Sequence, residues 1–155
     1  MTYPNVFEHD GSIYMMTDGG DNLQLYKAVN FPTEWVKHSD LHDNSYINPT
    51  VVFFKDVWWM FANVQQNHHI HLHVLWASSP LGPWESHPNN CVVETYNAEG
   101  EPVSHKCAGG AHVQKHHKTG PLLKGQIGIR SGGRAFVYKD KLYRMVQHSK
   151  EVQGM

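Results

Sequence analysis

Cysteines, charged residues and long apolar runs are all scarce in this sequence of 155 residues. The two cysteines, Cys91 and Cys107, are too few for a disulfide framework, and either one bridge or two reduced thiols would fit them. Charged residues make up 17% of the chain and the formal net charge is −1, which gives no general attraction to nucleic acid. No apolar run reaches the roughly 18 residues of a membrane-spanning helix, and no signal peptide is visible. The sequence therefore predicts no nucleic-acid partner and no membrane span, and the cellular location stays unknown.

Aromatic residues are abundant by contrast, and one pattern that contains them occurs three times. The copies are "VFEHDGSIYMM" (Val6–Met16), "VFFKDVWWMF" (Val52–Phe61) and "AFVYKDKLYRM" (Ala135–Met145). Each copy is a hydrophobic run, a polar corner and a second run with an aromatic, which is typical of a β-hairpin. Matching Phe7 with Phe53 gives a period of 46 residues between the first two copies.

The three corners differ in their turn residues. Asp10–Gly11 suits a tight two-residue turn, because glycine accepts a positive φ without steric cost. Lys55–Asp56 and Lys139–Asp140 occupy the matching corners without a glycine, which predicts a different turn type there.

A further repeated segment follows the first two hairpins. It reads "LQLYKAVNFPTEW" (Leu23–Trp35) and then "LHVLWASSPLGPW" (Leu72–Trp84), with a tryptophan seven residues after an alanine in both. This predicts a third strand, a proline-containing turn and a fourth strand, with both tryptophans in the core. Units of four strands at about 40–50 residues are typical of propeller blades.

The predicted fold class is therefore all-β, an incomplete β-propeller with about two and a half to three blades in a single domain, residues 1–155. The expected blade units are about 3–38, 46–90 and 128–155, with a His-, Gly- and Lys-rich insertion at about 97–127. That insertion reads as a long loop or as a degenerate blade. Because propellers usually close with four to eight blades, we expect a fragment of a longer propeller whose missing blades are its partners, or else self-assembly.

The residues also resemble a known family. The pieces "SPLGPW" and Arg130-x-x-Gly133-Arg134, within a similarity spanning most of Tyr3 to Ser149, are similar to the N-terminal domain of glucosamine inositolphosphorylceramide transferases. That domain is related to five-bladed glycosidases of the arabinanase and xylosidase kind. The resemblance implies a glycosidase-like propeller scaffold, a separate glycosyltransferase domain as partner, and a location in the secretory pathway or Golgi.

The function implied by the resemblance is that of a carbohydrate-related domain. It would belong to a glycosyltransferase-type protein in glycan or glycolipid synthesis of the glycosyl inositolphosphorylceramide kind, with a sugar or glycolipid substrate and no cofactor. One alternative is a glycosidase-type hydrolase with a degenerate active site. Another is a non-catalytic protein-interaction propeller. Whether the chain is itself an enzyme stays open.

Two polar positions bear on catalysis. Glycoside hydrolysis needs two carboxylates, one on either side of the scissile bond. In the related glycosidases an acid occurs in an Asp-Pro-Ser type motif, whereas the matching place here is Ile47–Thr50 with Asn48, which cannot ionise. Asn48 is therefore a candidate for binding a sugar hydroxyl, or else a cap of its strand. Asp18 is a candidate carboxylate or a turn residue, and no catalytic residue is assigned.

The segment of Arg130 and Arg134 is the strongest candidate for substrate binding. The two arginines flank glycines that let a ligand approach the backbone, and each guanidinium offers a planar fork of donors to carboxylate, phosphate or sugar oxygens. His148 closes the same unit and could add a polar contact. The alternative is a bulge with two surface arginines.

The run "HHIHLH" is a weak candidate for a metal site. His69, His71 and His73 alternate and would share one face of a strand, where imidazoles suit zinc or copper. Same-face neighbours are roughly 6.6 Å apart, too far for all three to bind one ion at about 2.1 Å each. Another ligand, such as His116 or His117, would be needed, so a solvated strand face is favoured.

Overall fold

The structure is a computed structural model, and it describes residues 2–18, 22–42, 45–66, 69–88, 90, 95–96, 102–103 and 130–147. Cys91, Cys107 and His148 lie outside these residues, as does the expected insertion at 97–127 apart from 102–103. The described residues form strands and turns, and none of their segments is a helix long and apolar enough to cross a membrane.

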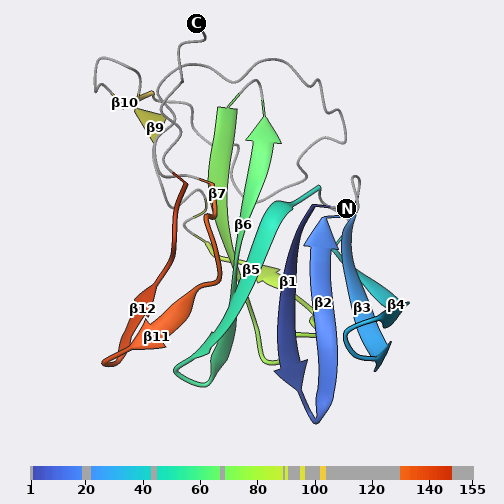
Figure 1. Ribbon diagram of the computed structural model, residues 1–155. Helices are drawn as coiled ribbons and strands as arrows, with labels where there is room; N and C mark the ends of the chain where they lie inside the picture. The colour runs from blue at the N-terminus through green and yellow to red at the C-terminus, as the bar shows by residue number, and fades with distance from the viewer. Residues whose placement is uncertain are drawn as a thin grey trace, which may run out of the picture.

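Two four-stranded antiparallel sheets of the same topology make up most of the fold (Figure 1). The first has the order β1-β2-β3-β4 and the second the order β5-β6-β7-β8, so each strand pairs with its neighbour in sequence. Their bounds are β1 Thr2–His9, β2 Ser12–Asp18, β3 Leu23–Asn30, β4 Glu34–His42, β5 Ile47–Phe54, β6 Val57–Gln66, β7 His69–Ala77 and β8 Glu85–Ser86.

Two short hairpins complete the described residues. The strands β11 (Phe136–Tyr138) and β12 (Lys141–Tyr143) repeat the first hairpin of a blade, and they lie beside β5 in Figure 1. The strands β9 (Thr95–Tyr96) and β10 (Pro102–Val103) form a separate two-stranded pair. The described part of the chain thus holds two full blades and the inner hairpin of a third, which confirms the predicted all-β, incomplete propeller. The number of blades in a closed ring stays a prediction.

All three inner hairpins use the same turn, which corrects the expectation of different types. Positive φ occurs at both central residues of Asp10–Gly11 (47° and 68°), Lys55–Asp56 (52° and 61°) and Lys139–Asp140 (47° and 55°). This is the signature of a type I′ turn, whose twist matches the right-handed twist of the flanking strands. The turn geometry therefore outweighs the cost of the left-handed conformation, about 1–2 kcal/mol for an ordinary residue.

Aligning the three turns also corrects the period of the repeat. The cross-strand pairs at matching positions are Phe7 with Tyr14, Val52 with Trp59 and Phe136 with Tyr143. The counterpart of Phe7 is therefore Val52 rather than Phe53, and the period is 45 residues, the separation of Asp10 and Lys55. A shift of one residue exchanges the two faces of a strand. Accordingly Val52 is 9% exposed, whereas Phe53 is 51% exposed.

The core lies between the two sheets and combines residues of both. Its buried members include Phe7, Tyr14, Met16, Leu23 and Leu25 from the first blade and Val51, Met60, Ala62, Val64 and Leu75 from the second. Trp84 belongs to this core, as predicted. Trp35 does not, because it is half-buried on the outer strand β4, where its indole N–H donates to the carbonyl oxygen of Pro32 at 2.9 Å.

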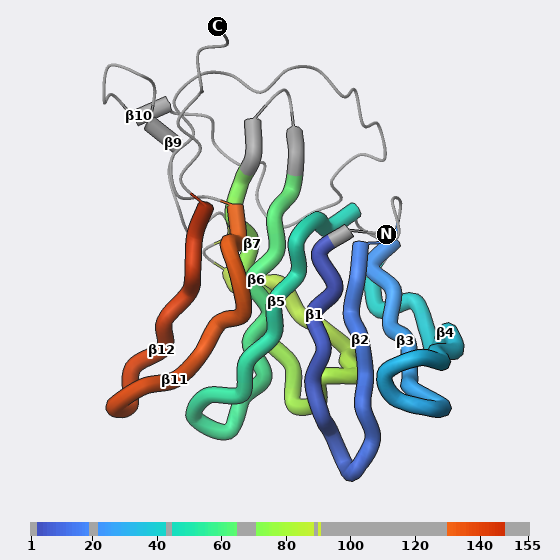
Figure 2. The backbone as a smooth tube through the Cα atoms, in the orientation of Figure 1, coloured from blue at the N-terminus to red at the C-terminus, as the bar shows by residue number. Residues whose placement is uncertain are grey.

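A repeated hydrogen bond links the first strands of the three blades, which lie in a row in Figure 2. Asn5 Oδ1 accepts the backbone N–H of Val51 at 3.2 Å, and Thr50 Oγ1 accepts the backbone N–H of Ala135 at 3.2 Å. Asn5 and Thr50 occupy the same position of successive blades, as do Val51 and Ala135. Asn5 also donates from Nδ2 to Thr50 Oγ1 at 3.5 Å. We call this series the inter-blade relay.

The inter-blade relay predicts that Thr50→Val destabilises the protein although the two side chains have nearly the same shape. The change removes the acceptor of the Ala135 N–H and leaves polar groups buried without a partner, at a cost of about 1–3 kcal/mol. Chemical denaturation followed by tryptophan fluorescence would measure it. Thr33→Val is the matched control, because the Thr33 hydroxyl bonds Asn30 at the surface. Equal unfolding free energies for the two variants would contradict the assignment.

The shared turn type predicts that Asp56→Gly stabilises the second hairpin. Glycine adopts the φ of 61° found there without steric cost, and this gain exceeds the added freedom of the unfolded chain by about 0.5 kcal/mol. Asp56→Ala removes the same carboxylate but keeps a Cβ, so it should not stabilise. Thermal unfolding of both variants checks this, and a lower melting temperature for the glycine variant would contradict it.

Candidate functional site

The first strands of the first two blades begin with the same irregularity. Tyr3 has a φ of 53° and Asn48 a φ of 52°, and each precedes a proline. In both strands the pairing register shifts at this point, between Thr2 and Asn5 and between Ile47 and Thr50. Bulges of this kind re-aim side chains at the rims of sheets. They give the blades a common rim, at the end of the hairpins opposite the type I′ turns.

Asn48 lies at this rim as the second residue of β5 and is half-buried. Asparagine tolerates the left-handed conformation better than most residues, which gives Asn48 a conformational reason to be there. Tyr3 occupies the equivalent position in the first blade, where a bulky residue holds the same unusual φ. Contact of Asn48 with a sugar stays a prediction.

Asp18 reaches the same rim from the second strand. It is the last residue of β2, pairs with Thr2 and is 8% exposed. Its counterpart in the second blade is Asn63, which pairs with Ile47 and whose Oδ1 accepts the N–H of Ser131 at 3.3 Å. In the second blade this position therefore supports the backbone of the next blade. Asp18 is the one carboxylate that the described first and second strands of the blades bring to this rim.

Backbone bonds hold the segment from Arg130 to Arg134 in place. Gly132 N–H donates to Met145 at 3.0 Å, and Gln147 N–H donates to the carbonyl oxygen of Arg130 at 3.0 Å. A Cβ on Gly132 would lie 2.7 Å from the carbonyl carbon of Val146, so only glycine fits there. Arg130 is half-buried and Arg134 is exposed. The Ser131 N–H donates to Asn63, which pairs with Ile47 next to Asn48. This bond brings the segment to the rim that carries Asn48 and Asp18.

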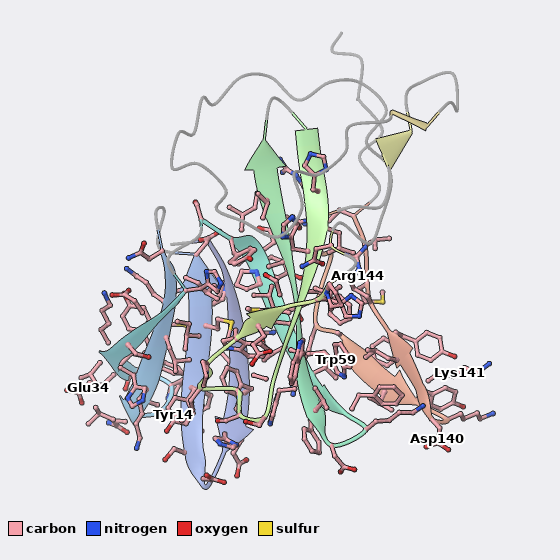
Figure 3. All side chains as sticks on the ribbon, turned by 180° about the vertical axis from the view of Figure 1, so that it is seen from behind. Tyr14, Glu34, Trp59, Asp140, Lys141 and Arg144 are labelled. Atoms are coloured by element: carbon pink, nitrogen blue, oxygen red, sulfur yellow. The ribbon has the colours of Figure 1, made fainter. Side chains whose placement is uncertain are left out.

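Two rim residues, Tyr3 and Arg144, were not identified from the sequence. Burial raises the pKa of Tyr3, while the backbone of Gly133 and the charge of Arg144 lower it by smaller amounts. Burial likewise lowers the pKa of Arg144, and Tyr3 partly offsets this. These mutual effects indicate an electrostatic interaction between Tyr3 of the first blade and Arg144 of the third. In Figure 3 Arg144 lies at the opposite end of its hairpin from the turn residues Asp140 and Lys141.

The aligned repeats already distinguish Arg144 from the residues at the same position of the other blades. With the turns aligned, its counterparts are Met15 in the first blade and Met60 in the second, of which Met60 is fully buried. Continuing the pairing of Phe136 with Tyr143 by one residue puts Arg144 opposite Ala135. A charged residue at a position that otherwise holds methionine, opposite a small residue, indicates a special role.

His71 and His73 of β7 do not lie on the solvated face that the sequence favoured. His71 is 6% exposed, and the ring of His73 lies 6.0 Å from that of the buried Tyr46. Burial first, and the charge of His71 second, lower the pKa of His73 to about 4. The alternation placed these residues on one face, but that face packs toward the first blade. No group of three or more metal-ligating residues occurs within the described ranges, and the side chains of His69, His116 and His117 lie outside them.

The fold is that of glycosidase-type β-propellers. An endo-arabinase from Bacteroides thetaiotaomicron VPI-5482 superposes with a TM-score of 0.51 and 14% sequence identity, over 66% of this chain and 43% of that one. At this identity the likeness concerns the fold alone. The amino-acid sequence shows a family relationship that the fold alone does not. The family model described as glucosamine inositolphosphorylceramide transferase 1, N-terminal, matches residues 1–114, and the chain belongs to this family.

Relatives in plants agree with this assignment. Glucosamine inositolphosphorylceramide transferase 1 of Oryza sativa subsp. indica is 29% identical over 160 residues, covering 99% of this chain and 18% of that protein. The protein of the same name from Arabidopsis thaliana is 30% identical over 162 residues, covering 99% and 17%. The predicted family is thereby confirmed. The chain spans less than a fifth of the length of these relatives.

The buried His73 predicts a loss of stability in mild acid. Because its pKa is about 4 in the folded protein, against the ordinary 6.5 of a histidine, the unfolded chain takes up a proton between these pH values that the folded chain does not. The full stability is present above pH 6.5 and falls as the pH decreases toward 4, by an amount on the order of 3 kcal/mol. Urea unfolding at both pH values should show a smaller fall for His73→Gln. The exposed His38→Gln should behave as wild type, and a wild-type slope for both would contradict the prediction.

Proposed function

We propose that this chain is a carbohydrate-binding propeller segment of a glycosyltransferase-type protein that acts in glycolipid synthesis of the glycosyl inositolphosphorylceramide kind. Its family membership supports the substrate class. The ligand is the sugar-bearing headgroup of a glycolipid, and it binds at the rim where the first strands of the blades begin. Sugar transfer itself is assigned to a separate glycosyltransferase domain, which together with further blades is the expected partner.

The observation that carries the proposal is the gathering of hydrogen-bond donors at one rim. Arg130 and Arg134 lie in a segment held by backbone bonds, and that segment is tied through Ser131 to the blade that bears Asn48. Guanidinium groups bind phosphate and carboxylate oxygens bidentately, and an amide side chain both donates and accepts as a sugar hydroxyl requires. His148 is proposed to join this set. An inositol phosphate headgroup offers both kinds of partner.

The same rim is poorly suited to glycoside hydrolysis. A hydrolase needs two carboxylates, about 5–9.5 Å apart depending on the mechanism. Asn48 cannot ionise, which leaves Asp18 as the one carboxylate on the described first and second strands at this end. We therefore propose binding without hydrolysis. A purely protein-interacting propeller would show no affinity for sugars at all.

Calorimetric titration with the glucosamine-bearing headgroup of an inositol phosphate lipid tests the proposal. Wild type should bind, and Arg134→Gln and Arg130→Gln should each weaken binding about tenfold, which is the loss of about 1.4 kcal/mol of charge-assisted hydrogen bonding. Lys141→Gln is the control, because it removes a positive charge from the same hairpin at its opposite end (Figure 3).

Two outcomes would overturn the proposal. One is absence of binding by wild type at millimolar concentrations of the headgroup. The other is equal weakening by Lys141→Gln and the rim variants, since that would indicate general attraction between charges instead of a site. Release of free sugar from the headgroup, abolished by Asp18→Asn, would support the hydrolase alternative instead.

A further inference from the structure

The third blade carries an exposed aromatic pair whose counterpart in the first blade is buried. The rings of Phe136 and Tyr143 stack with centroids 5.4 Å apart and an interplanar angle of 12°. Phe7 and Tyr14, at the same positions of the first blade, stack in the same way at 5.9 Å and 20°. Phe7 and Tyr14 are 4% and 6% exposed, however, whereas Phe136 and Tyr143 are 44% and 40% exposed. The third blade thus exposes a surface that the first blade buries.

The second blade covers the aromatic pair of the first. The ring of Trp58 lies 6.0 Å from that of Phe7, and the buried Val51 donates its N–H to Asn5 of the first blade. Each blade therefore has a forward face, which receives another blade, and a backward face, which packs on another blade. The contact between the first two blades joins one face of each kind.

One face of each kind stays exposed in the part of the chain that the structure describes. The forward face of the third blade consists of Arg134, Phe136, Tyr143 and Met145. The backward face of the first blade consists of Val6, Glu8, Ile13 and Met15, the counterparts of Val51, Phe53, Trp58 and Met60. Val6 and Glu8 are exposed, and Ile13 and Met15 are half-buried. In Figure 1 the first blade and the β11–β12 hairpin lie on opposite sides of β5.

We propose that these two faces bind one another between copies of this chain, so that the first blade of a second copy packs on the third blade. This contact continues the packing that already exists between blades within the chain. Ile13 of the second copy takes the place of Trp58 over the stacked pair. Because the two faces differ, the association is heterologous and runs head to tail. It goes beyond the proposed function, since it requires no headgroup.

Opposite charges on the two faces favour a second copy as the occupant. Arg134 holds the position in the third blade that Asn5 holds in the first, where Asn5 reaches the N–H of Val51. Phe53, the counterpart of Glu8, is two residues further along that strand. Residues on the same face of a strand are roughly 6.6 Å apart when they are two positions apart, a distance that a long arginine side chain spans. Arg134 of one copy therefore meets Glu8 of the next, which fixes the direction of the contact.

The same arginine limits the strength of the association. A guanidinium has no acceptor, so Arg134 cannot take the N–H of Val6 from a second copy as Asn5 takes that of Val51. The inter-blade relay is therefore not continued across this contact. We expect association that is weaker than the packing within the chain and that depends on protein concentration.

Two single variants test the head-to-tail contact. Phe136→Glu places a charge on the forward face, and Val6→Glu places one on the backward face. Sedimentation velocity at increasing protein concentration should show self-association of wild type and a monomer for each variant alone. An equimolar mixture of the two variants should form a dimer and nothing larger, because each variant keeps the face that the other has lost. Formation of this dimer also shows that both variants are folded.

Val29→Glu is the matched control. Val29 is exposed on β3, outside both faces, so this variant should associate as wild type does. Charge reversal at exposed positions provides a second test that does not disturb the aromatic pair. Glu8→Arg and Arg134→Glu should each raise the dissociation constant at least tenfold, and the double variant should return it toward that of wild type. All measurements are made without headgroup, because Arg134 also belongs to the proposed binding site.

Four outcomes would overturn the proposal. They are a wild type that stays monomeric up to millimolar concentration, a mixture of Phe136→Glu and Val6→Glu that stays monomeric although both variants unfold cooperatively on heating, equal weakening by Val29→Glu, and no restoration by the double charge reversal. A monomeric wild type that binds the headgroup would leave the proposed function standing and assign the forward face of the third blade to a different partner. Self-association without headgroup binding would remove the proposed function and keep the contact between copies.

Discussion

The backbone N–H groups along the first strand of each blade need acceptors when another blade packs against them. Sheet pairing within a blade does not provide these acceptors, and a buried N–H without a partner is costly. In this protein side chains provide them, Asn5 for Val51 and Thr50 for Ala135. The inter-blade relay thus sets both the spacing and the register of neighbouring blades. The core between the two sheets and the common rim depend on it.

The rim follows from this constraint together with the conformation of each hairpin. A type I′ turn at one end fixes the register of the two inner strands, and in the first two blades a bulge at the other end shifts it by one residue. Once the relay has aligned the blades, both bulges lie on the same side of the molecule. Residues that are about 45 or 130 positions apart in the sequence, such as Tyr3, Asn48 and Gly133, therefore come together. Carbohydrate recognition is proposed at the rim for this reason.

Several features of the fold could be predicted because they depend on local pattern. The four-strand unit, the inner hairpin of each of the three blades and the place of each turn follow from aromatic runs separated by polar turn residues. The period was wrong by one residue because "VFF" offers three apolar residues in succession, and only cross-strand pairing decides that Val52 and not Phe53 faces the core. The turn type was wrong at Lys55–Asp56 because strand twist, and not residue preference, selected it. The alternation in β7 predicts one face for His71 and His73, but what covers that face is a property of the packed blades.

The sequence by itself determined the all-β class, the repeated blade unit and the family. Strand periodicity and motif spacing are local properties, so they can be recognised from the order of the residues alone. The candidates at Asn48, Arg130 and Arg134 could also be named from residue chemistry alone. The tertiary structure decided which of them share a rim, that Asp18 has an equivalent which supports the next blade, and that Tyr3 and Arg144 interact electrostatically. These contacts join residues far apart in the chain, and their existence depends on the hydrogen bonds and packing between blades, which no local pattern encodes.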